Sequence, residues 1–239
     1  MEPTIGILGG MGPEATVDFF AKIVALTPAR RDQDHPRVVI DSNPKVPDRT
    51  AAILGHGDSP VPALIAGLEV LQRAGANFVA MPCVSAHVFL DELRQKSSLP
   101  ILSMFEVLVE ELTARHPGIR QVGVLATQGT IRAGGLVTRL QQAGIGCVLP
   151  SGSEQERVMA CVYEIKGATG GRARSRSEVA IEVRELAGRL IGRGAQGVVL
   201  GCTEIPLVLK PGEVPVPVFD LTLLLARAAI RAAGRTPRD

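Results

Sequence analysis

The chain has 239 residues, 46% hydrophobic and 21% charged, which is the balance of an ordinary globular protein with one large or two small domains. A formal net charge of +2, no Trp and a single Tyr argue against a protein that binds nucleic acid or a membrane surface. No apolar run reaches the ~18 residues of a membrane span. The four cysteines have no CxxC or other metal-ligand spacing, so we expect no bound metal. Free thiols in a chain without a recognisable secretion signal favour the cytoplasm.

The chain opens with a strand, a glycine turn and a helix. Residues 4–8 are apolar and β-branched, and they predict a short strand. The three glycines that follow permit a tight turn and let a ligand approach the backbone closely. Pro13 suits the first turn of a helix, which we expect over residues 14–26. The N-terminus of that helix is a natural seat for a carboxylate, so Met11 and Gly12 are candidate substrate-binding residues.

The same turn also fits Gly10-x-Gly12-x-x-Ala15, a form of the dinucleotide fingerprint. That fingerprint requires an acidic residue at the end of the second strand, and Asp41 stands there at a somewhat long spacing. A nucleotide-binding module therefore stays an alternative, although it does not explain the pair of cysteines described below.

The loop over residues 42–50 carries Asn43 and Arg49. An arginine in a loop is usually a solvated surface charge. An arginine that follows a strand end can instead hold a carboxylate through two parallel hydrogen bonds. Arg49 is therefore a candidate carboxylate-binding residue.

A second strand-to-helix unit contains Cys83. An amphipathic helix is predicted over residues 61–74, and an apolar strand leads from it to Cys83. Ser85 is then a candidate cap for the next helix. A strand over residues 100–104 and a helix over residues 105–115 complete the first half.

The second half repeats this plan. A strand over residues 121–126 leads to Thr127, where hydroxyl groups replace the glycines of the first half. Lys166 stands at the end of a later helix, where it is either a helix C-terminal cation or a second candidate for binding substrate. An amphipathic helix over residues 179–190 precedes the strand that leads to Cys202. A last strand over residues 214–219 contains two prolines and is expected at a sheet edge, and a final helix closes the chain.

The two halves align on each other. Residues 71–83 match residues 190–202 without a gap, which places Cys83 on Cys202. The opening strand and turn of each half also line up, at an offset that differs by only two residues. The pattern predicts a duplicated unit that puts two thiols in related positions.

We therefore predict an α/β fold of two pseudo-symmetric lobes, each with a mostly parallel sheet flanked by helices. The first lobe is expected over residues 1–116 plus 214–239, and the second over residues 117–213. Ligands bind outside the carboxyl ends of the strands in open α/β sheets, so the active site is expected in the cleft between the lobes.

Two thiols at one cleft suit a two-base reaction. A thiolate near a helix N-terminus has a lowered pKa. One thiolate and one thiol on opposite faces of a carbon remove a proton and return one from the other side, which inverts the stereocentre. Cysteines in a β-rich core are most often only buried, but the polar residues that follow each thiol favour a catalytic role: Ser85 after Cys83, and Thr203 and Glu204 after Cys202.

These motifs resemble the aspartate/glutamate racemase family, and within it the aspartate racemases, over nearly the whole chain. The resemblance is carried by residues 6–13, 43–44, 47–50, 81–83 and 201–204. It implies amino-acid racemisation by Cys83 and Cys202 without pyridoxal phosphate or another cofactor, a small dicarboxylic substrate, most of all aspartate, and a homodimer. It also implies that Arg49 and Lys166 bind the substrate carboxylates and that Asn43, Ser85 and Thr203 line the site. The further candidates for substrate binding are Met11, Gly12, Val84, Thr127 and Glu204.

The sequence departs from the family pattern at one position. The family has Asn-Thr-Ala-His after the first cysteine, and this chain has Val84, Ser85, Ala86 and His87. The hydroxyl is kept at Ser85, but Val84 has no amide with which to hold the substrate. A related isomerase or lyase acting on another small dicarboxylate therefore stays open, although the loss of one cysteine would have favoured a decarboxylase and both are present.

Overall fold

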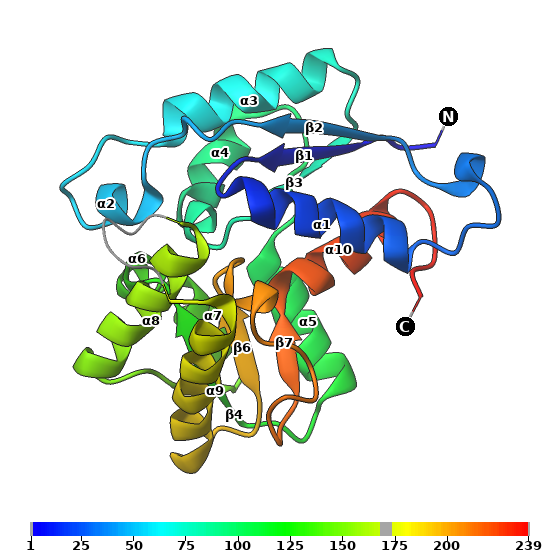
Figure 1. Ribbon diagram of the computed structural model, residues 1–239. Helices are drawn as coiled ribbons and strands as arrows, with labels where there is room; N and C mark the ends of the chain where they lie inside the picture. Colours follow the sequence, from blue (N-terminus) through cyan, green and yellow to red (C-terminus); the bar gives the residue numbers. More distant parts are fainter. Residues whose placement is uncertain (1, 168–173, 239) are drawn as a thin grey trace. The chain divides into compact units, whose positions relative to one another are not determined.

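The computed structural model describes residues 2–167 and 174–238, which fall into two compact units. Unit 1 comprises Met1–Val107 and Thr222–Asp239, and unit 2 comprises Leu108–Leu221. Each unit contains one parallel sheet with helices packed against it (Figure 1). The predicted α/β fold with two parallel sheets is therefore confirmed.

Unit 1 is built on a three-stranded sheet in the order β2-β1-β3. Strand β1 is buried along its whole length, because α1 and α3 lie on opposite sides of the sheet (Figure 1). The elements of this unit are β1 (Ile5–Gly9), α1 (Pro13–Leu26), the 3₁₀ helix η1 (Asp32–Asp34), β2 (Val38–Ser42), α2 (Arg49–Ile53), α3 (Val61–Arg73), β3 (Phe78–Ala80), the 3₁₀ helix η2 (Ser85–Phe89) and α4 (Leu90–Lys96). Helix α5 (Met104–Arg115) begins in unit 1 and continues into unit 2.

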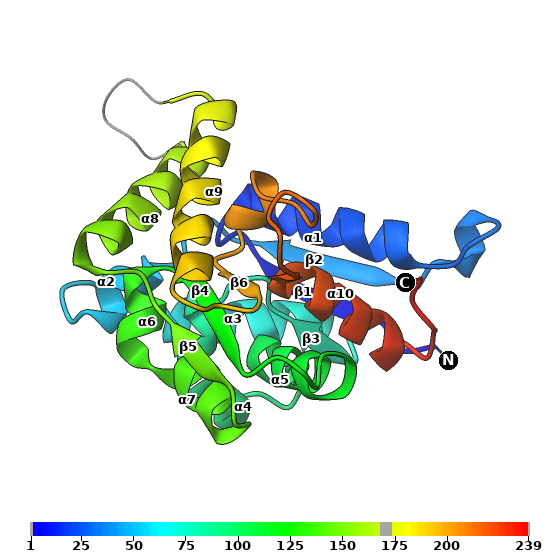
Figure 2. The same cartoon turned by 90° about the horizontal axis from the view of Figure 1, so that it is seen from below.

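The end of the chain completes unit 1. Helix α10 (Leu221–Ala232) lies beside α1 in both views (Figures 1 and 2). Lys22 Nζ on α1 donates a hydrogen bond to Thr222 Oγ1 at 2.5 Å, and the Arg238 backbone N–H donates to Leu26 O at 2.7 Å. The C-terminal helix therefore packs on the first unit, as the sequence predicts.

Unit 2 is built on a four-stranded sheet in the order β5-β4-β6-β7. Helices α8 and α9 lie side by side in this unit (Figure 2). Strand β7 lies at the sheet edge and begins just after Pro217, which confirms the predicted edge position. The elements are β4 (Gln121–Ala126), α6 (Gln128–Ala133), α7 (Gly135–Gln142), β5 (Gly146–Val148), α8 (Gly152–Ile165), α9 (Arg176–Gly192), β6 (Val198–Gly201), the 3₁₀ helix η3 (Ile205–Leu207) and β7 (Val218–Asp220).

The two sheets share one pairing register. Gly6 of β1 pairs with Val79 of β3, and Gly123 of β4 pairs with Val198 of β6. These are the same residue pairs that the internal alignment brings into correspondence. The duplication is thus present in the backbone as well as in the sequence.

Each paired glycine admits the close approach of the crossover segment that leads to the next strand. A Cβ atom on Gly6 would lie 2.9 Å from Ala76 Cβ, in the turn after α3, and a Cβ atom on Gly123 would lie 2.8 Å from Leu190 Cβ on α9. Real Cβ atoms essentially never come this close, so a larger residue would push the crossover segment away from its strand. Both positions therefore require glycine for packing.

Two expectations differ from the structure. The strand expected over residues 100–104 is a single bridge between Val79 and Ile101, because α5 already begins at Met104. Residues 108–116 and 214–221, expected in the first lobe, belong to unit 2, where β7 pairs with β6. Among residues 2–167 and 174–238, no helix has the length and apolar character needed to cross a membrane.

The glycine contact in unit 2 predicts a measurable cost. Gly123→Ala is expected to destabilise the protein by about 1–3 kcal/mol, because the added methyl group overlaps Leu190. Urea unfolding would show this as a lower midpoint. Gly188→Ala on α9 is the matched control: a Cβ there meets nothing within 4 Å, and the change should stabilise the helix by up to about 1 kcal/mol. Equal midpoints for the Gly123→Ala variant and the parent would contradict the packing argument.

Candidate active site

Cys83 lies just beyond the carboxyl end of β3. Its side chain is buried in an apolar cluster that also contains Met11 of the glycine turn and Val46 of the loop before α2. The fold thus brings three separate sequence motifs of unit 1 into one apolar cluster. Cys83 itself is 4% exposed, so it is not the accessible thiol that a surface cysteine would be.

His87 fixes the backbone at Cys83. Its Nε2 accepts a hydrogen bond from the Met104 N–H at 3.1 Å, so the ring proton stands on Nδ1 and is donated to Cys83 O at 2.9 Å. Burial lowers the pKa of His87 to about 4, so the ring is neutral at physiological pH. His87 is a positioning residue that sequence reasoning missed, although its place one helical turn after the cysteine was a signal.

The glycine turn packs against the chain itself. Gly10 has a φ of +88°, and a Cβ there would lie 2.4 Å from backbone atoms of Asn43. The Gly10 N–H donates to Thr16 Oγ1 at 2.8 Å, and that hydroxyl donates to Gly12 O at 3.0 Å. The turn therefore brings the candidate residues Met11 and Gly12 close to Asn43.

The acidic residue of the dinucleotide fingerprint has a packing role as well. The Asp41 carboxylate lies against α3, where a Cβ on Gly67 would be 2.7 Å from Asp41 Oδ2. Burial raises the pKa of Asp41. Together with the contact between Gly10 and Asn43, this accounts for the residues of the fingerprint by packing within unit 1.

Arg49 is a buried cation, not a solvated surface charge. It is the first residue of α2, which Asp48 caps by accepting a hydrogen bond from the Ala51 N–H. Arg49 Nη1 donates to Val46 O and Pro47 O at 3.0 and 2.9 Å, while Nε has no hydrogen-bond partner within the described part of the chain. The guanidinium is thus held in place by backbone carbonyls and keeps one donor unused there.

Val84 and Ser85 follow Cys83 directly in the sequence, and both side chains are buried. Val84 precedes η2, and Ser85 is the first residue of that 3₁₀ helix. No side-chain cap is formed at this helix, so the expected capping role of Ser85 is wrong. Ser85 is the first residue within this 3₁₀ helix, and the position before the helix is taken by Val84.

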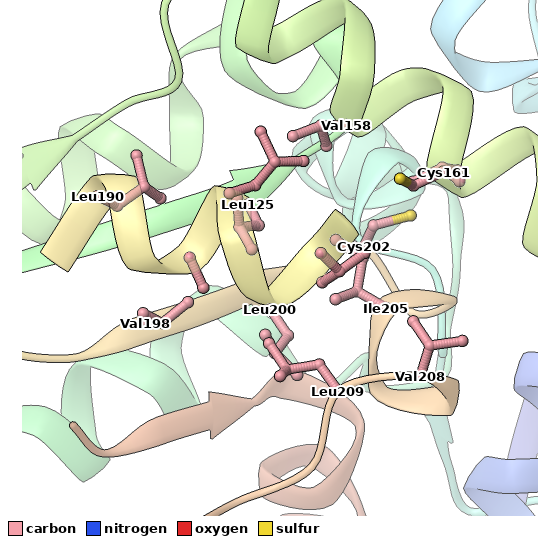
Figure 3. Packing of buried hydrophobic residues seen from close by; sticks show 14 of the residues in the cluster. Leu125, Val158, Cys161, Leu190, Val198, Leu200, Cys202, Ile205, Val208 and Leu209 are labelled. Atoms are coloured by element: carbon pink, nitrogen blue, oxygen red, sulfur yellow. The ribbon is translucent and has the colours of Figure 1, made fainter. Parts of the chain in front are cut away.

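Cys202 occupies the corresponding position in unit 2, just after β6. Its side chain points toward α8, the helix that carries Cys161, within an apolar cluster that includes Leu125 and Ile205 (Figure 3). Cys202 Sγ donates a hydrogen bond to Glu204 Oε2 at 2.9 Å. The second thiol is therefore buried and bonded to a carboxylate.

Glu204 is the centre of a small polar group. Thr203 Oγ1 donates to Glu204 Oε2 at 3.3 Å, and Lys166 Nζ lies 3.3 Å from Glu204 Oε1. The contact with Lys166 is an ion pair without hydrogen-bond geometry, since Oε1 has no hydrogen-bond partner among the residues described. Lys166 is the C-terminal cap residue of α8, so the helix end brings the cation to the segment after Cys202.

The electrostatics around Cys202 differ from the sequence expectation. Burial and, next, the Glu204 carboxylate raise the pKa of Cys202 well above that of an ordinary thiol, while Lys166 acts in the opposite direction. The expected lowering of a thiol pKa by a helix N-terminus is therefore wrong for Cys202. Only the three-residue η3 follows it, and a carboxylate stands closer.

The remaining candidates have clear structural contacts. Thr127 caps α6, and its hydroxyl accepts from the Thr130 N–H and lies 3.0 Å from Thr130 Oγ1.

The other two cysteines lie elsewhere in unit 2. Cys147 on β5 is half-buried, and burial raises its pKa to about 11. Cys161 on α8 is buried. Within the described ranges, no three side chains of His, Cys, Asp or Glu lie close enough together to hold a metal ion.

Several candidate residues fall in two groups, one in each unit. In unit 1 the glycine turn, the loop before α2 and the segment after β3 contribute Met11, Val46 and Cys83 to one apolar cluster, and Arg49 bonds to the Met11 and Val46 carbonyls. In unit 2, Lys166 and Glu204 meet beside Cys202.

The chain is similar to proteins of one family along most of its length. The family model for Asp/Glu/Hydantoin racemase matches residues 8–229. The chain is 28% identical over 230 residues to the broad specificity amino-acid racemase RacX of Bacillus subtilis (strain 168), covering 95% of this chain and 96% of that protein.

Solved structures give the same result. An aspartate racemase from Picrophilus torridus superposes with a TM-score of 0.83 at 29% identity, over 99% of this chain and 96% of that one. An aspartate racemase homologue from Pyrococcus horikoshii OT3 superposes with a TM-score of 0.77 at 26% identity, over 98% of this chain and all of that one. The overall fold is thus shared along nearly the full length of both.

The buried His87 predicts an acid-sensitive stability. Because its pKa is about 4 when folded and about 6.5 when exposed, the unfolded chain binds the proton more readily between these values. The contribution of neutral His87 is fully present above about pH 6.5 and is lost as the pH falls toward about 4, by up to about 3 kcal/mol.

Urea unfolding at about pH 7 and about pH 4.5 measures this loss. The His87→Gln variant should be less stable at neutral pH and should lose less stability on acidification than the parent. His56→Gln, at an exposed turn after α2, is the control and should behave as the parent. An equal loss in the parent and the His87→Gln variant would contradict the assignment.

Proposed function

Because this chain belongs to the Asp/Glu/Hydantoin racemase family, we propose that it is a cofactor-independent amino-acid racemase whose acid–base pair is Cys83 and Cys202. The observation that carries the proposal is the equivalent position of the two thiols, each just beyond the strand that pairs with the first strand of its unit, β3 beside β1 and β6 beside β4. The racemase relatives, which cover nearly the whole chain, support the same class of reaction.

In the proposed reaction the two thiols act on opposite faces of the substrate Cα. One sulfur takes the α-proton as a thiolate, and the other delivers its own proton to the opposite face, which inverts the centre. Carbon next to a carboxylate is a far weaker acid than a thiol, so the developing negative charge must be stabilised by fixed donors and cations. The buried Arg49 guanidinium and the Lys166 ammonium group are the proposed cations.

Aspartate is the proposed first substrate. The Picrophilus torridus relative is an aspartate racemase, and two cations suit the two carboxylates of a dicarboxylic amino acid. The place of Lys166 at the end of α8, beside the segment that follows Cys202, supports this role. Arg49 supports it through its one unused buried donor within the described chain.

Val84 favours a wider range of substrates than a strict aspartate racemase would have. A buried, branched apolar side chain replaces an amide beside the catalytic thiol. The Bacillus subtilis relative is a broad specificity amino-acid racemase, which supports the same direction. A homodimer and a cytoplasmic location belong to this proposal, the latter supported by four free cysteines.

The two-thiol assignment predicts the effect of single substitutions. Cys83→Ser and Cys202→Ser should each reduce racemisation by about 10²–10⁴-fold, because serine has nearly the same size but is far less acidic. Chiral chromatography of aspartate and glutamate measures the rate, and circular dichroism checks the fold. Cys147→Ser is the matched control and should keep the parent rate. Parent activity in either of the first two variants would refute the two-base mechanism.

Val84 provides the test of specificity. Val84→Asn should raise kcat/KM for aspartate by up to about tenfold, since an amide adds hydrogen bonds worth about 0.5–1.5 kcal/mol each. The same change should not help alanine, which has no side-chain carboxylate. Val70→Asn, at an exposed position of α3, is the control. If the aspartate value stays level or falls in the Val84→Asn variant, Val84 is suited to another substrate and the aspartate assignment fails.

A further inference from the structure

Glu204 is a buried carboxylate whose closest contact is the Cys202 thiol. It is 3% exposed, and its Oε2 accepts hydrogen bonds from Cys202 Sγ at 2.9 Å and from Thr203 Oγ1 at 3.3 Å. An anion that accepts a hydrogen bond from S–H stabilises the thiol and opposes formation of the thiolate. The carboxylate therefore acts on the protonation state of Cys202.

The other groups around Cys202 come from α8 and the segment that precedes α9. Lys166, at the end of α8, pairs with Glu204 Oε1. Cys161 of α8 belongs to the same apolar cluster as Cys202, and its sulfur accepts a hydrogen bond from Arg174 Nη2 at 3.6 Å. Glu204 Oε2 accepts the hydrogen bond from the Cys202 thiol, whereas the Lys166 ammonium group lies against the other carboxylate oxygen, Oε1.

We propose that Glu204, anchored by Lys166, holds the proton of Cys202, so that Cys202 is the proton donor of the resting enzyme and Cys83 is the proton acceptor. This assignment rests on the proposed racemase function. Among the described residues of unit 1, no carboxylate is hydrogen-bonded to the Cys83 thiol, so the two thiols have different hydrogen-bonding surroundings. Glu204 is here a positioning residue, since it acts on the substrate only through Cys202.

The proton steps balance without any redox change. Cys83 takes the α-proton, which breaks the Cα–H bond on one face and forms S–H. Cys202 gives its proton to the other face, which forms the new Cα–H bond and leaves a thiolate. That thiolate then stands within hydrogen-bond distance of the Glu204 anion, so it recovers a proton from solvent readily. Cys83 releases the proton that it took to solvent, and the enzyme is then back in its starting state.

The experiment follows the reactivity of Cys202 in the substrate-free protein. Iodoacetamide alkylation at about pH 8 is quantified for each cysteine by peptide mass spectrometry, since only the thiolate reacts. In Glu204→Gln the anion is removed while Lys166 stays, so alkylation of Cys202 should rise about tenfold or more, as a pKa falls by about one unit or more. In Lys166→Met it should fall below the parent rate.

Two controls make the result specific. Glu156→Gln, at an exposed position of α8, should leave the Cys202 rate at the parent value. Cys147 should react equally in all variants, and a rise there would identify unfolding. Parent or slower alkylation of Cys202 in Glu204→Gln overturns the proposal. If that variant does not fold, an unchanged or faster rate in Lys166→Met overturns it instead.

Alkylation needs neither substrate nor turnover, so this test stands apart from the racemase proposal. A second reading applies to the active enzyme. In Glu204→Gln the alkaline limb of kcat/KM against pH should move to lower pH, because that limb reports loss of the donor proton. A merely structural role for Glu204 would lower activity at every pH and leave the limb where it is. An inactive parent with the expected alkylation pattern would refute the racemase function and keep the role of Glu204.

Discussion

The packing of a helix against a strand glycine, made once in each unit, is the contact on which the placement of both thiols depends. A Cβ atom on Gly6 would lie 3.3 Å from Leu71 Cδ1 of α3 and 2.9 Å from Ala76 Cβ just after that helix, and a Cβ atom on Gly123 would lie 2.8 Å from Leu190 Cβ of α9. This proximity fixes how each crossover helix sits on its sheet, and with it the register of the strand that the helix delivers. Each cysteine follows four residues after the valine that pairs with that glycine, so Cys83 and Cys202 occupy equivalent places.

Equivalent placement does not mean equivalent chemistry. The neutral His87 donates a hydrogen bond to the Cys83 backbone carbonyl and not to its sulfur. Beside Cys202 stands a carboxylate that bonds to the sulfur itself. A two-base reaction needs one partner with a proton and one without, and identical surroundings would leave that choice unresolved. The duplicated fold places the two thiols in equivalent positions. The residues around them, His87 near Cys83 and Glu204 near Cys202, make their hydrogen bonding different.

Much of this could be predicted from the sequence, because the duplicated pattern constrains strand order and strand ends. Periodicity gave the helices and strands around both cysteines, and the alignment gave the matching register. Contacts between distant side chains were not predictable in the same way. Nothing in local spacing shows that Lys166 lies against Glu204, or that Glu204 turns back onto Cys202. Ser85 was expected at a helix cap by its type, but the chain forms a 3₁₀ turn there instead. Arg49 was singled out by its place after a strand end, but its burial follows from carbonyls that only the folded loop brings together.

Hydrogen exchange at the substrate Cα is the most direct test of racemisation by Cys83 and Cys202. The protein, without added cofactor and in the presence of a chelator, is incubated in deuterated water with L- or D-aspartate and followed by proton NMR and chiral chromatography. We expect that the Cα proton is replaced by solvent deuterium as the centre inverts, from either enantiomer, and that the exchange is lost when both thiols are alkylated. Absence of exchange with every amino acid tried, or exchange that persists after alkylation of both thiols, would contradict it.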